Sequence, residues 1–289
     1  MTTAIETVPP ADVKGLTRVT ERHATGPAIL SNLILAGIAL LFALPLLWLV
    51  LASVDKHASW SIAIPHFTLS NFGSSLSNGR GSSLVASLEL AAIATVVGTV
   101  TGTLAAYAFS RRHIPWKGPA LLFVLLLSAV PINVIIIPVY QIFSQAGWLS
   151  LIPTAIFLGI TGLPFEIWMI KNFIDAVPTE LEEAARVENV GTMRIIGRIV
   201  VPLAAPGIGA AAIYGFVNAW GAFLIPLVLI SSTAQQPAAI TVYSFISAAE
   251  VNYGGIAAFS ILYSLPVLAL YLVMGRWFRG GFVLGGALK

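Results

Sequence analysis

Six apolar stretches of about 20 residues or more constrain the fold of this chain more than any other feature. They cover approximately residues 27–53, 83–110, 119–140, 151–173, 203–230 and 256–278. A helix needs about 20 apolar residues to cross the hydrocarbon core of a bilayer. Because lipid offers no partner for unpaired backbone groups, and because such long apolar runs do not suit a barrel strand, helix is the favoured structure. The sequence therefore predicts an all-α membrane protein with six transmembrane helices.

The composition supports the same class. Apolar residues make up 57% of the chain, charged residues make up 9%, and the mean hydropathy is +0.91. A soluble globular protein carries about 25% charged residues. Such a chain cannot cover a water-facing surface, so lipid is expected to be its main solvent. The absence of cysteine excludes disulfides and thiolate metal sites.

The placement of the basic residues predicts the orientation. If the N-terminus is cytoplasmic, the inner segments hold 13 of the 15 Lys and Arg residues, and the outer loops hold only Lys56 and Arg80. Positive charge concentrates on the cytoplasmic side of membrane proteins. Both termini are therefore expected in the cytoplasm. Residues 1–26 are predicted to be a cytoplasmic tail and residues 27–289 a membrane domain, whose first apolar stretch exceeds the core of about 7–15 residues found in a signal peptide.

A polar segment between the fourth and fifth apolar stretches carries signals of two short helices. Pro178 suits a first helical turn, and Thr179 and Glu182 have the spacing of a capping box. Asn189 suits a left-handed C-terminal stop, and Thr192 can cap a second helix. An ordinary cytoplasmic loop remains the alternative interpretation.

This segment resembles the "EAA" loop of the permeases of binding-protein-dependent ABC importers. The family pattern is E-A-A, a Gly four residues after the second Ala, then I-x-L-P. Here Glu183-Ala184-Ala185 match, Asn189 stands at the Gly position, and Ile199-Val200-Val201-Pro202 fall in register with Val201 in place of Leu. The stretches AAYAFSRRHIPWKG, IIIPVYQIF and RWFRGGFVLGGALK are similar to the carbohydrate (maltose-type) branch.

The resemblance implies a type I ABC importer permease fold and an ATP-driven function in a bacterial cell membrane. The chain would form half of a translocation pathway for a sugar delivered by an extracytoplasmic binding protein. Its partners would be a second homologous permease subunit, two ATPase subunits that bind ATP and magnesium, and the lipid bilayer. The coupling loop would span about residues 174–202. Its ATPase-coupling residues would be Glu182, Glu183, Ala184, Ala185, Arg186, Glu188 and Asn189.

The sequence offers little for catalysis. No Gly-Lys pair occurs, so a phosphate-binding loop of the G-x-x-x-x-G-K-[ST] kind is excluded. The four histidines lie outside the apolar stretches without the spacing of a metal motif. We therefore expect a permease that is not an enzyme and that binds no cofactor, metal or nucleic acid. A membrane enzyme would need a convergent His/Asp/Glu/Ser set, which the sequence does not offer.

Two carboxylates, Glu89 and Glu166, lie within predicted spans. A carboxylate at bilayer depth costs about 2.5–3.5 kcal/mol and normally faces a partner or water. Glu166 follows Gly162-Leu163-Pro164, where we expect a break in the helix. The alternative function is a proton-coupled secondary transporter that uses both carboxylates, although no inverted repeat is evident. A purely structural role for Glu166 also remains open.

The fifth apolar stretch offers aromatic and amide side chains that suit a sugar. Asn218 and Trp220 project about 200° apart on an ideal helix. The family commonly has W-N-x-F here, whereas this chain has Trp220-Gly221-Ala222-Phe223. Packing is the alternative role for these aromatic residues. The substrate-pathway candidates are Trp220, Asn218, Tyr214, Phe223 and Glu166.

Small residues at helical spacing mark two helix faces. Gly98 and Gly102 form a G-x-x-x-G in the second stretch, and Gly207, Ala211 and Gly215 line one side of the fifth. Such faces let helix backbones approach closely in lipid. The sequence leaves open whether they meet another subunit or pack within this chain.

Overall fold

The structure of the chain, a computed structural model, describes residues 25–246 and 251–286. Most of the tail predicted over residues 1–26 and the last three residues of the chain lie outside this range. Every regular element in the described part is helical, and its only extended pairings are two isolated β-bridges. The all-α prediction is therefore confirmed.

Four long helices coincide with four of the predicted apolar stretches. They are α1 (Thr25–Ser53), α3 (Arg80–Arg111), α6 (Leu151–Asp175) and α13 (Tyr253–Gly286). Each contains a segment long and apolar enough to cross a membrane. Two further bent pairs of helices would bring the number of crossings to as many as six. The described residues thus hold four to six candidate spans.

The third predicted stretch is not one straight helix. It consists of α4 (Lys117–Leu127), η2 (Ile132–Ile135) and α5 (Ile136–Ala146), and the two halves meet at 75°. Pro131 stands at the break with an extended backbone. Proline lacks a backbone donor and disfavours a helical conformation in the residue before it. A sharp bend at Pro131 therefore divides the third predicted stretch, and its two halves together make at most one candidate span.

The fifth predicted stretch is also shorter than expected. Here α10 (Ala205–Trp220) ends well before residue 230, and α11 (Leu224–Leu229) forms a separate short helix. Before α10, the chain passes through α8 (Thr192–Ile195), a π-helical turn at Ile196–Val200 and α9 (Val201–Leu203). These preceding turns meet α10 at 85°.

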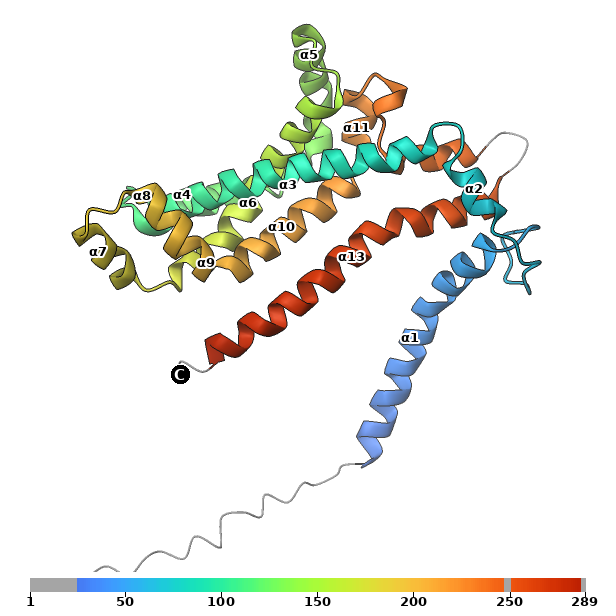
Figure 1. Cartoon of the computed structure of the whole chain (residues 1–289), viewed down its shortest axis with the longest axis horizontal. Helices are drawn as coiled ribbons and strands as arrows, with labels where there is room; N and C mark the ends of the chain where they lie inside the picture. Colours follow the sequence, from blue (N-terminus) through green and yellow to red (C-terminus); the bar gives the residue numbers. More distant parts are fainter. Residues whose placement is uncertain (1–24, 247–250, 287–289) are drawn as a thin grey trace, which may run out of the picture. The chain divides into compact units, whose positions relative to one another are not determined.

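Short elements fill the connections between the long helices, including the polar segment in which two short helices were predicted. They are α2 (Ser70–Leu76) before α3, α7 (Thr179–Val187) after α6, and η4 (Thr233–Gln235), α12 (Ala238–Thr241) and η5 (Val242–Phe245) before α13. Figure 1 shows α2 near one end of α3 and α7 with α8 near the other. One end of α3 therefore lies beside the α1–α2 connection, and the other end lies beside the polar segment that contains α7 and α8.

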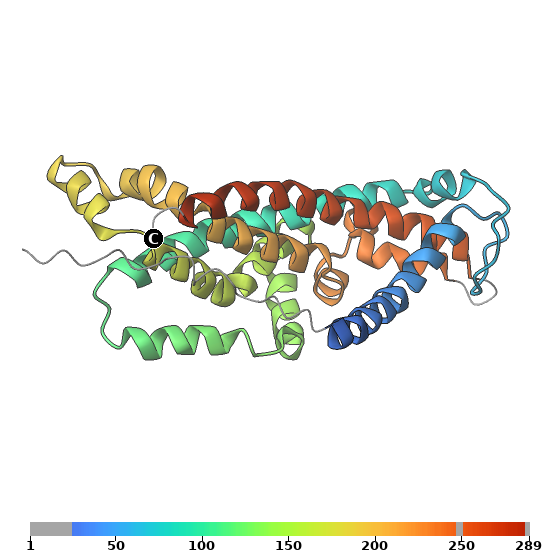
Figure 2. The ribbon, with the colours of Figure 1, turned by 90° about the horizontal axis from the view of Figure 1, so that it is seen from below.

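The packed centre of residues 48–286 is formed by α3, α6 and α10, which lie against one another (Figures 1 and 2). Its buried side chains are mostly small, which allows close helix approach. A Cβ on Gly159 would lie 2.6 Å from the carbonyl oxygen of Ala94, and one on Gly207 would overlap the Phe173 ring. Along α1, by contrast, the side chains of residues 30–47 are all exposed in the chain alone.

Candidate functional site

The first candidate site lies where α7 meets the C-terminal end of α3. Glu182 of α7 is 2% exposed. Its Oε2 accepts a hydrogen bond of 2.8 Å from the Tyr107 hydroxyl, and its Oε1 accepts one of 2.7 Å from Nε of Arg111. Arg186, one turn along α7, lies 3.4 Å from the same carboxylate. We call these four residues the Glu182 cluster.

Arg111 extends this cluster to a third element. Its Nη2 donates to the carbonyl oxygens of Ile174 and Val177, at 3.0 and 2.6 Å. These carbonyls lie at and just beyond the C-terminal end of α6, where helical partners run out. One guanidinium therefore joins the ends of α3 and α6 to α7. Charge-assisted hydrogen bonds of this kind are roughly twice as strong as neutral ones.

The end of α7 follows the sequence prediction, whereas its start does not. Asn189 has φ of 59°, and the N–H groups of Asn189 and Val190 bond to the carbonyls of Arg186 and Ala185, both at 3.0 Å. This is the Schellman pattern of a left-handed stop. The capping box was wrong because the Glu182 carboxylate turns toward α3 rather than to its own first turn.

The second short helix also begins differently from the prediction. Gly191 stands at its N-cap position and makes no side-chain capping bond, so Thr192 is the first helical residue rather than the cap. The two-helix organisation itself is confirmed.

The remaining predicted coupling residues separate by exposure. Glu182 is buried and Ala185 is partly buried, whereas the other members are exposed: Glu183, Ala184, Arg186, Glu188 and Asn189. Three large apolar side chains beside them are also exposed, at 46% for Leu181, 83% for Val187 and 71% for Met193. These three residues were not among the coupling residues predicted from the sequence. Their signal was an apolar residue within an otherwise charged segment.

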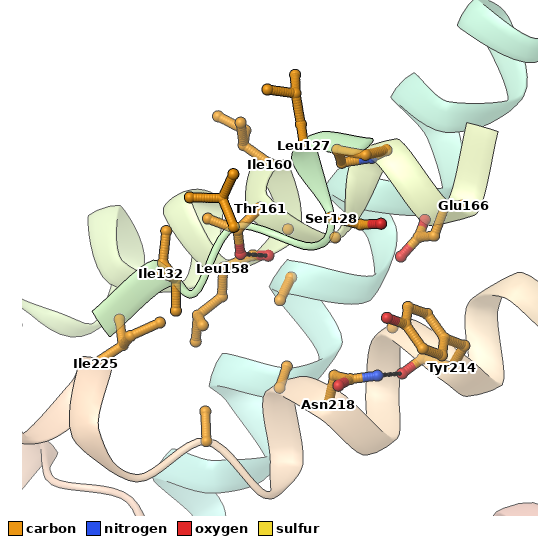
Figure 3. A pocket seen from close by; sticks show the side chains of 18 of the residues that line it. Leu127, Ser128, Ile132, Leu158, Ile160, Thr161, Glu166, Tyr214, Asn218 and Ile225 are labelled. Carbon is orange, nitrogen blue, oxygen red and sulfur yellow. Dashed lines mark hydrogen bonds between the residues drawn. The ribbon is translucent and has the colours of Figure 1, made fainter. Parts of the chain in front are cut away.

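The second candidate site is a cavity of about 620 Å³ that the central helices share with the bend after α4. Figure 3 shows its walls, with α6 and α10 facing one another. Apolar side chains supply most of the lining. Its polar side chains are Ser128, Asn133, Thr161, Glu166, Tyr214 and Asn218. The lining carries one carboxylate and no basic side chain.

Glu166 is a buried residue of the cavity wall with an oxygen that accepts no hydrogen bond from the described residues. It is 1% exposed, and its Oε2 has no hydrogen-bond partner among the described residues. The helix around it is continuous from Leu151 to Asp175 through Pro164. The predicted break before Glu166 was therefore wrong, because an α-helix in lipid can tolerate a proline when neighbouring helices support it.

Four glycines surround the Glu166 side chain, and we call them the glycine cradle. A Cβ on Gly98 would lie 2.9 Å from both carboxylate oxygens, and one on Gly215 would lie 2.6 Å from Oε1. Gly162 would place a Cβ 3.3 Å from Oε1, and Gly102 would place one 3.5 Å from the Glu166 Cβ. Three helices thus leave out side chains to make room for one carboxylate. The glycines of the two predicted small-residue faces therefore pack against residues of this chain.

The structure brings three of the five pathway candidates together. Glu166, Tyr214 and Asn218 line the same cavity, where the Asn218 amide donates to the Tyr214 carbonyl at 2.8 Å (Figure 3). Glu89 does not line the cavity and lies exposed on α3. The two carboxylates of the proton-coupled alternative therefore do not share this cavity.

Trp220 and Phe223 lie elsewhere. Trp220 is 4% exposed and stacks between Phe216 and Tyr263, with ring centroids 5.6 and 5.0 Å away. Its Nε1 donates to the Tyr263 carbonyl, and the Tyr263 hydroxyl donates back to the Trp220 carbonyl. Phe223 packs near Tyr243 at 5.1 Å. Neither residue lines the cavity that holds Glu166.

Comparisons with known proteins assign the chain to a family. Residues 98–280 match the family described as "Binding-protein-dependent transport system inner membrane component". A putative ABC transporter permease protein of Streptomyces antibioticus is 33% identical and covers 74% of this chain and 92% of its own length. The trehalose transport system permease protein SugB of Mycobacterium tuberculosis is 30% identical, covering 93% of this chain and 98% of its own.

Solved structures show the same fold. A bacterial ABC transporter involved in the import of the acidic polysaccharide alginate matches with a TM-score of 0.71 at 18% identity, over 86% of this chain and 95% of that chain. The MetNI methionine ABC transporter matches with a TM-score of 0.53 at 15% identity, over 72% and 97%. None of these findings supports a proton-coupled transporter. The chain belongs to the inner membrane components of binding-protein-dependent transport systems, with the permease fold of type I ABC importers.

Proposed function

We propose that this permease carries a sugar as one of two membrane subunits of an ATP-driven importer. Sugar as the substrate class rests on the resemblance to the maltose-type branch and on relatives named for trehalose and maltodextrin transport. Six crossings would place both termini on the same side of the membrane, and the distribution of basic residues assigns that side as the cytoplasm. Residues 1–26 would then be a tail and residues 27–289 the membrane domain. The partners would be a second permease subunit, an extracytoplasmic binding protein and two ATPase subunits that hold ATP and magnesium.

The observation that carries the proposal is the two-sided construction of α7. Its inner side is fixed to α3 and α6 through the Glu182 cluster. Its other side exposes Glu183, Ala184 and Val187. A helix that is anchored on one side and uncovered on the other suits a protein partner. We assign that partner as an ATPase subunit, and the coupling loop as residues 174–202.

The test is Glu183→Lys, which reverses a charge on the uncovered side. Reversing one member of an interfacial charge pair costs about 2–5 kcal/mol. The carboxylate of Glu183 makes no ion pair among the described residues, so insertion and folding should persist. We expect normal abundance in the membrane, loss of co-purifying ATPase subunits and loss of uptake. Full uptake with ATPase subunits still bound would overturn the coupling assignment.

Asn189 provides a matched pair of controls. Gly takes the left-handed conformation readily, so Asn189→Gly should have a mild effect. Asn189→Val should weaken ATPase retention, because a β-branched residue resists a φ of 59°. Equal retention by both variants would show that the end of α7 does not set the docking geometry.

The proposed orientation has its own test. Ser74 and Thr192 are both exposed and lie in the connections at opposite ends of α3. A cysteine at Ser74 should react with an impermeant thiol reagent added to intact cells, and a cysteine at Thr192 should react only after the membrane is opened. The reverse pattern would invert the topology.

The cavity is the proposed contribution of this chain to the sugar pathway. Tyr214 supplies an aromatic face, and Asn218 and Glu166 supply polar groups on the facing helices. Sites that hold small molecules combine apolar walls with a few fixed polar groups. Because Trp220 and Phe223 are engaged in aromatic packing, they are the weaker pathway candidates. A ligand screen of the associated binding protein would identify the sugar.

A further inference from the structure

The connection between α1 and α2 folds back on itself and is closed by one antiparallel bridge; we call residues 54–68 the ribbon. The N–H of Lys56 bonds to the carbonyl of His66 at 3.0 Å, and the N–H of Thr68 bonds to the carbonyl of Val54 at 2.7 Å. Asp55 and Phe67 form the antiparallel bridge between these bonds. The ribbon therefore brings together residues that are 10 to 14 positions apart in the sequence.

Asp55 is fixed at the base of this ribbon. Its Oδ1 accepts the backbone N–H groups of His57 and His66, at 3.1 and 2.9 Å. The Asn71 amide donates to the Asp55 carbonyl at 2.8 Å, which holds the backbone as well. The hydrogen bonds from His57 and His66 lower the pKa of the Asp55 carboxyl. The two backbone hydrogen bonds thus fix the direction of the carboxylate.

The two histidine side chains gather over this carboxylate. The rings of His57 and His66 are nearly perpendicular, with centroids 5.3 Å apart. Nδ1 of His66 lies 3.8 Å from Oδ1 of Asp55. One ligand atom from each of the three residues lies within 4.8 Å of the other two. Both imidazoles are exposed, so they can rotate without disturbing a packed core.

These distances are close to what a transition metal requires. Zinc bonds of about 2.0–2.2 Å to nitrogen and oxygen place tetrahedral ligand atoms roughly 3.3–3.5 Å apart. The three ligand atoms would therefore need to close by about 1.5 Å at most. Imidazole suits zinc, copper, iron and nickel, and a carboxylate is an acceptable third ligand. Three protein ligands leave the remaining coordination positions for water.

We propose that Asp55, His57 and His66 bind a divalent transition metal ion of the zinc type. The ion would connect the two strands of the ribbon through side chains, next to the backbone bonds that already join them. Sequence spacing gave no sign of this site, because the ligands become neighbours only when the ribbon closes. The site lies in the connection at the end of α3 remote from the Glu182 cluster, and it does not depend on the proposed sugar transport.

The first test is a zinc titration of the full chain in detergent, purified through a tag that contains no histidine and stripped with a chelator. We expect one saturable equivalent of Zn²⁺ by calorimetry, and Co²⁺ in its place should give a visible absorption spectrum. His57→Ala and His66→Ala should each weaken binding at least tenfold. Asp55→Asn should also weaken it, because the amide can accept the same backbone bonds without the charge.

His113 supplies the matched control, since it lies outside the ribbon. His113→Ala should bind Zn²⁺ as tightly as the unaltered chain. Binding that survives the His57→Ala/His66→Ala double variant, or no saturable binding by the unaltered chain, would overturn the proposal.

A second readout follows the ribbon itself. Lys56 is exposed and lies between two of the proposed ligands, so trypsin can report on the opening of the ribbon there. Zn²⁺ should slow cleavage after Lys56 in the unaltered chain and leave its rate unchanged in His66→Ala. Equal slowing in both proteins would show that the metal acts elsewhere.

Discussion

Glu182 and Glu166 are both buried glutamates, with exposures of 2% and 1%, yet their surroundings are opposite. Glu182 accepts hydrogen bonds from Tyr107 and Arg111 and faces Arg186 as well. Glu166 has an oxygen without any described partner, and glycines surround it instead of donors. Burying a charge without hydrogen-bond partners is costly. Only Glu182 has its partners within the described part of this chain.

The difference in hydrogen bonding indicates that the two buried glutamates have different roles. A carboxylate whose two oxygens both accept hydrogen bonds from its own chain holds elements together. One that is given space but no donors remains available to something that enters from outside, such as the hydroxyl of a ligand or water. Substitutions at the two carboxylates and at the residues around them test this division of roles.

The largest effect is expected for Glu182→Ala. This change removes the carboxylate that pairs with the Arg111 guanidinium. Because the Arg111 side chain is only 10% exposed, water cannot fully replace that partner. Removing one partner of a buried ion pair costs about 3–5 kcal/mol. We expect a clearly lowered melting temperature of the purified chain and loss of ATPase retention. The neighbouring Glu183→Ala, which removes an exposed carboxylate, should change stability by less than about 0.5 kcal/mol.

A smaller loss is expected when the glycine cradle is filled. In Gly215→Ala the new methyl group would lie 2.6 Å from Oε1 of Glu166, so the carboxylate or a helix must shift. Overpacking of this kind costs about 1–3 kcal/mol. Combining it with Glu166→Ala should recover much of the loss, since the clashing side chain is then absent. Additive effects in this double-mutant cycle would contradict the cradle.

Gly118 offers the control for that experiment. A Cβ there would meet no atom within 4 Å, and the residue lies in the first turns of α4. Gly118→Ala should leave the melting temperature unchanged or raise it slightly, because Ala favours helix over Gly.

The smallest effect on stability is expected for Glu166→Gln. The amide is nearly isosteric, and its oxygen gives up no described hydrogen bond. The complex should assemble normally with a stability change below about 1 kcal/mol. If the carboxylate contacts the sugar, the KM of uptake should rise while abundance stays constant. Uptake that matches the unaltered protein would assign Glu166 a structural role only.

The sequence predicted those features of the fold that depend on local chemistry. The places of α1, α3, α6 and α13 in the sequence follow from apolar length, because a helix must be long enough to cross the hydrocarbon core, although α13 ends at Gly286 and not near residue 278. The left-handed stop at Asn189 follows from a local backbone preference. Bends are harder to predict, since Pro131 breaks a helix and Pro164 does not. What decides between them is support from neighbouring helices, which a single segment does not encode.

The candidate sites depend on distant contacts and were predicted less well. The capping-box spacing of Thr179 and Glu182 satisfied a local rule, but the donors that hold Glu182 lie 75 and 71 residues earlier. The glycine spacing at Gly98 and Gly102 correctly indicated a close approach. It could not indicate that the approaching group is a carboxylate from α6.

The continuity of α3 has a mechanical consequence. The Glu182 cluster holds this helix at Tyr107, and the glycine cradle lies on it at Gly98. At 1.5 Å per residue, the two points are roughly 14 Å apart along the axis. A tilt of about 10° pivoting at the cluster would therefore carry Gly98 sideways by roughly 2–3 Å, taking α3 as a rigid rod. That displacement rivals the 2.9 Å between a Cβ at Gly98 and the Glu166 oxygens. Any tilt of α3 relative to α6 would therefore change the room that the glycines of α3 leave for the buried carboxylate of Glu166.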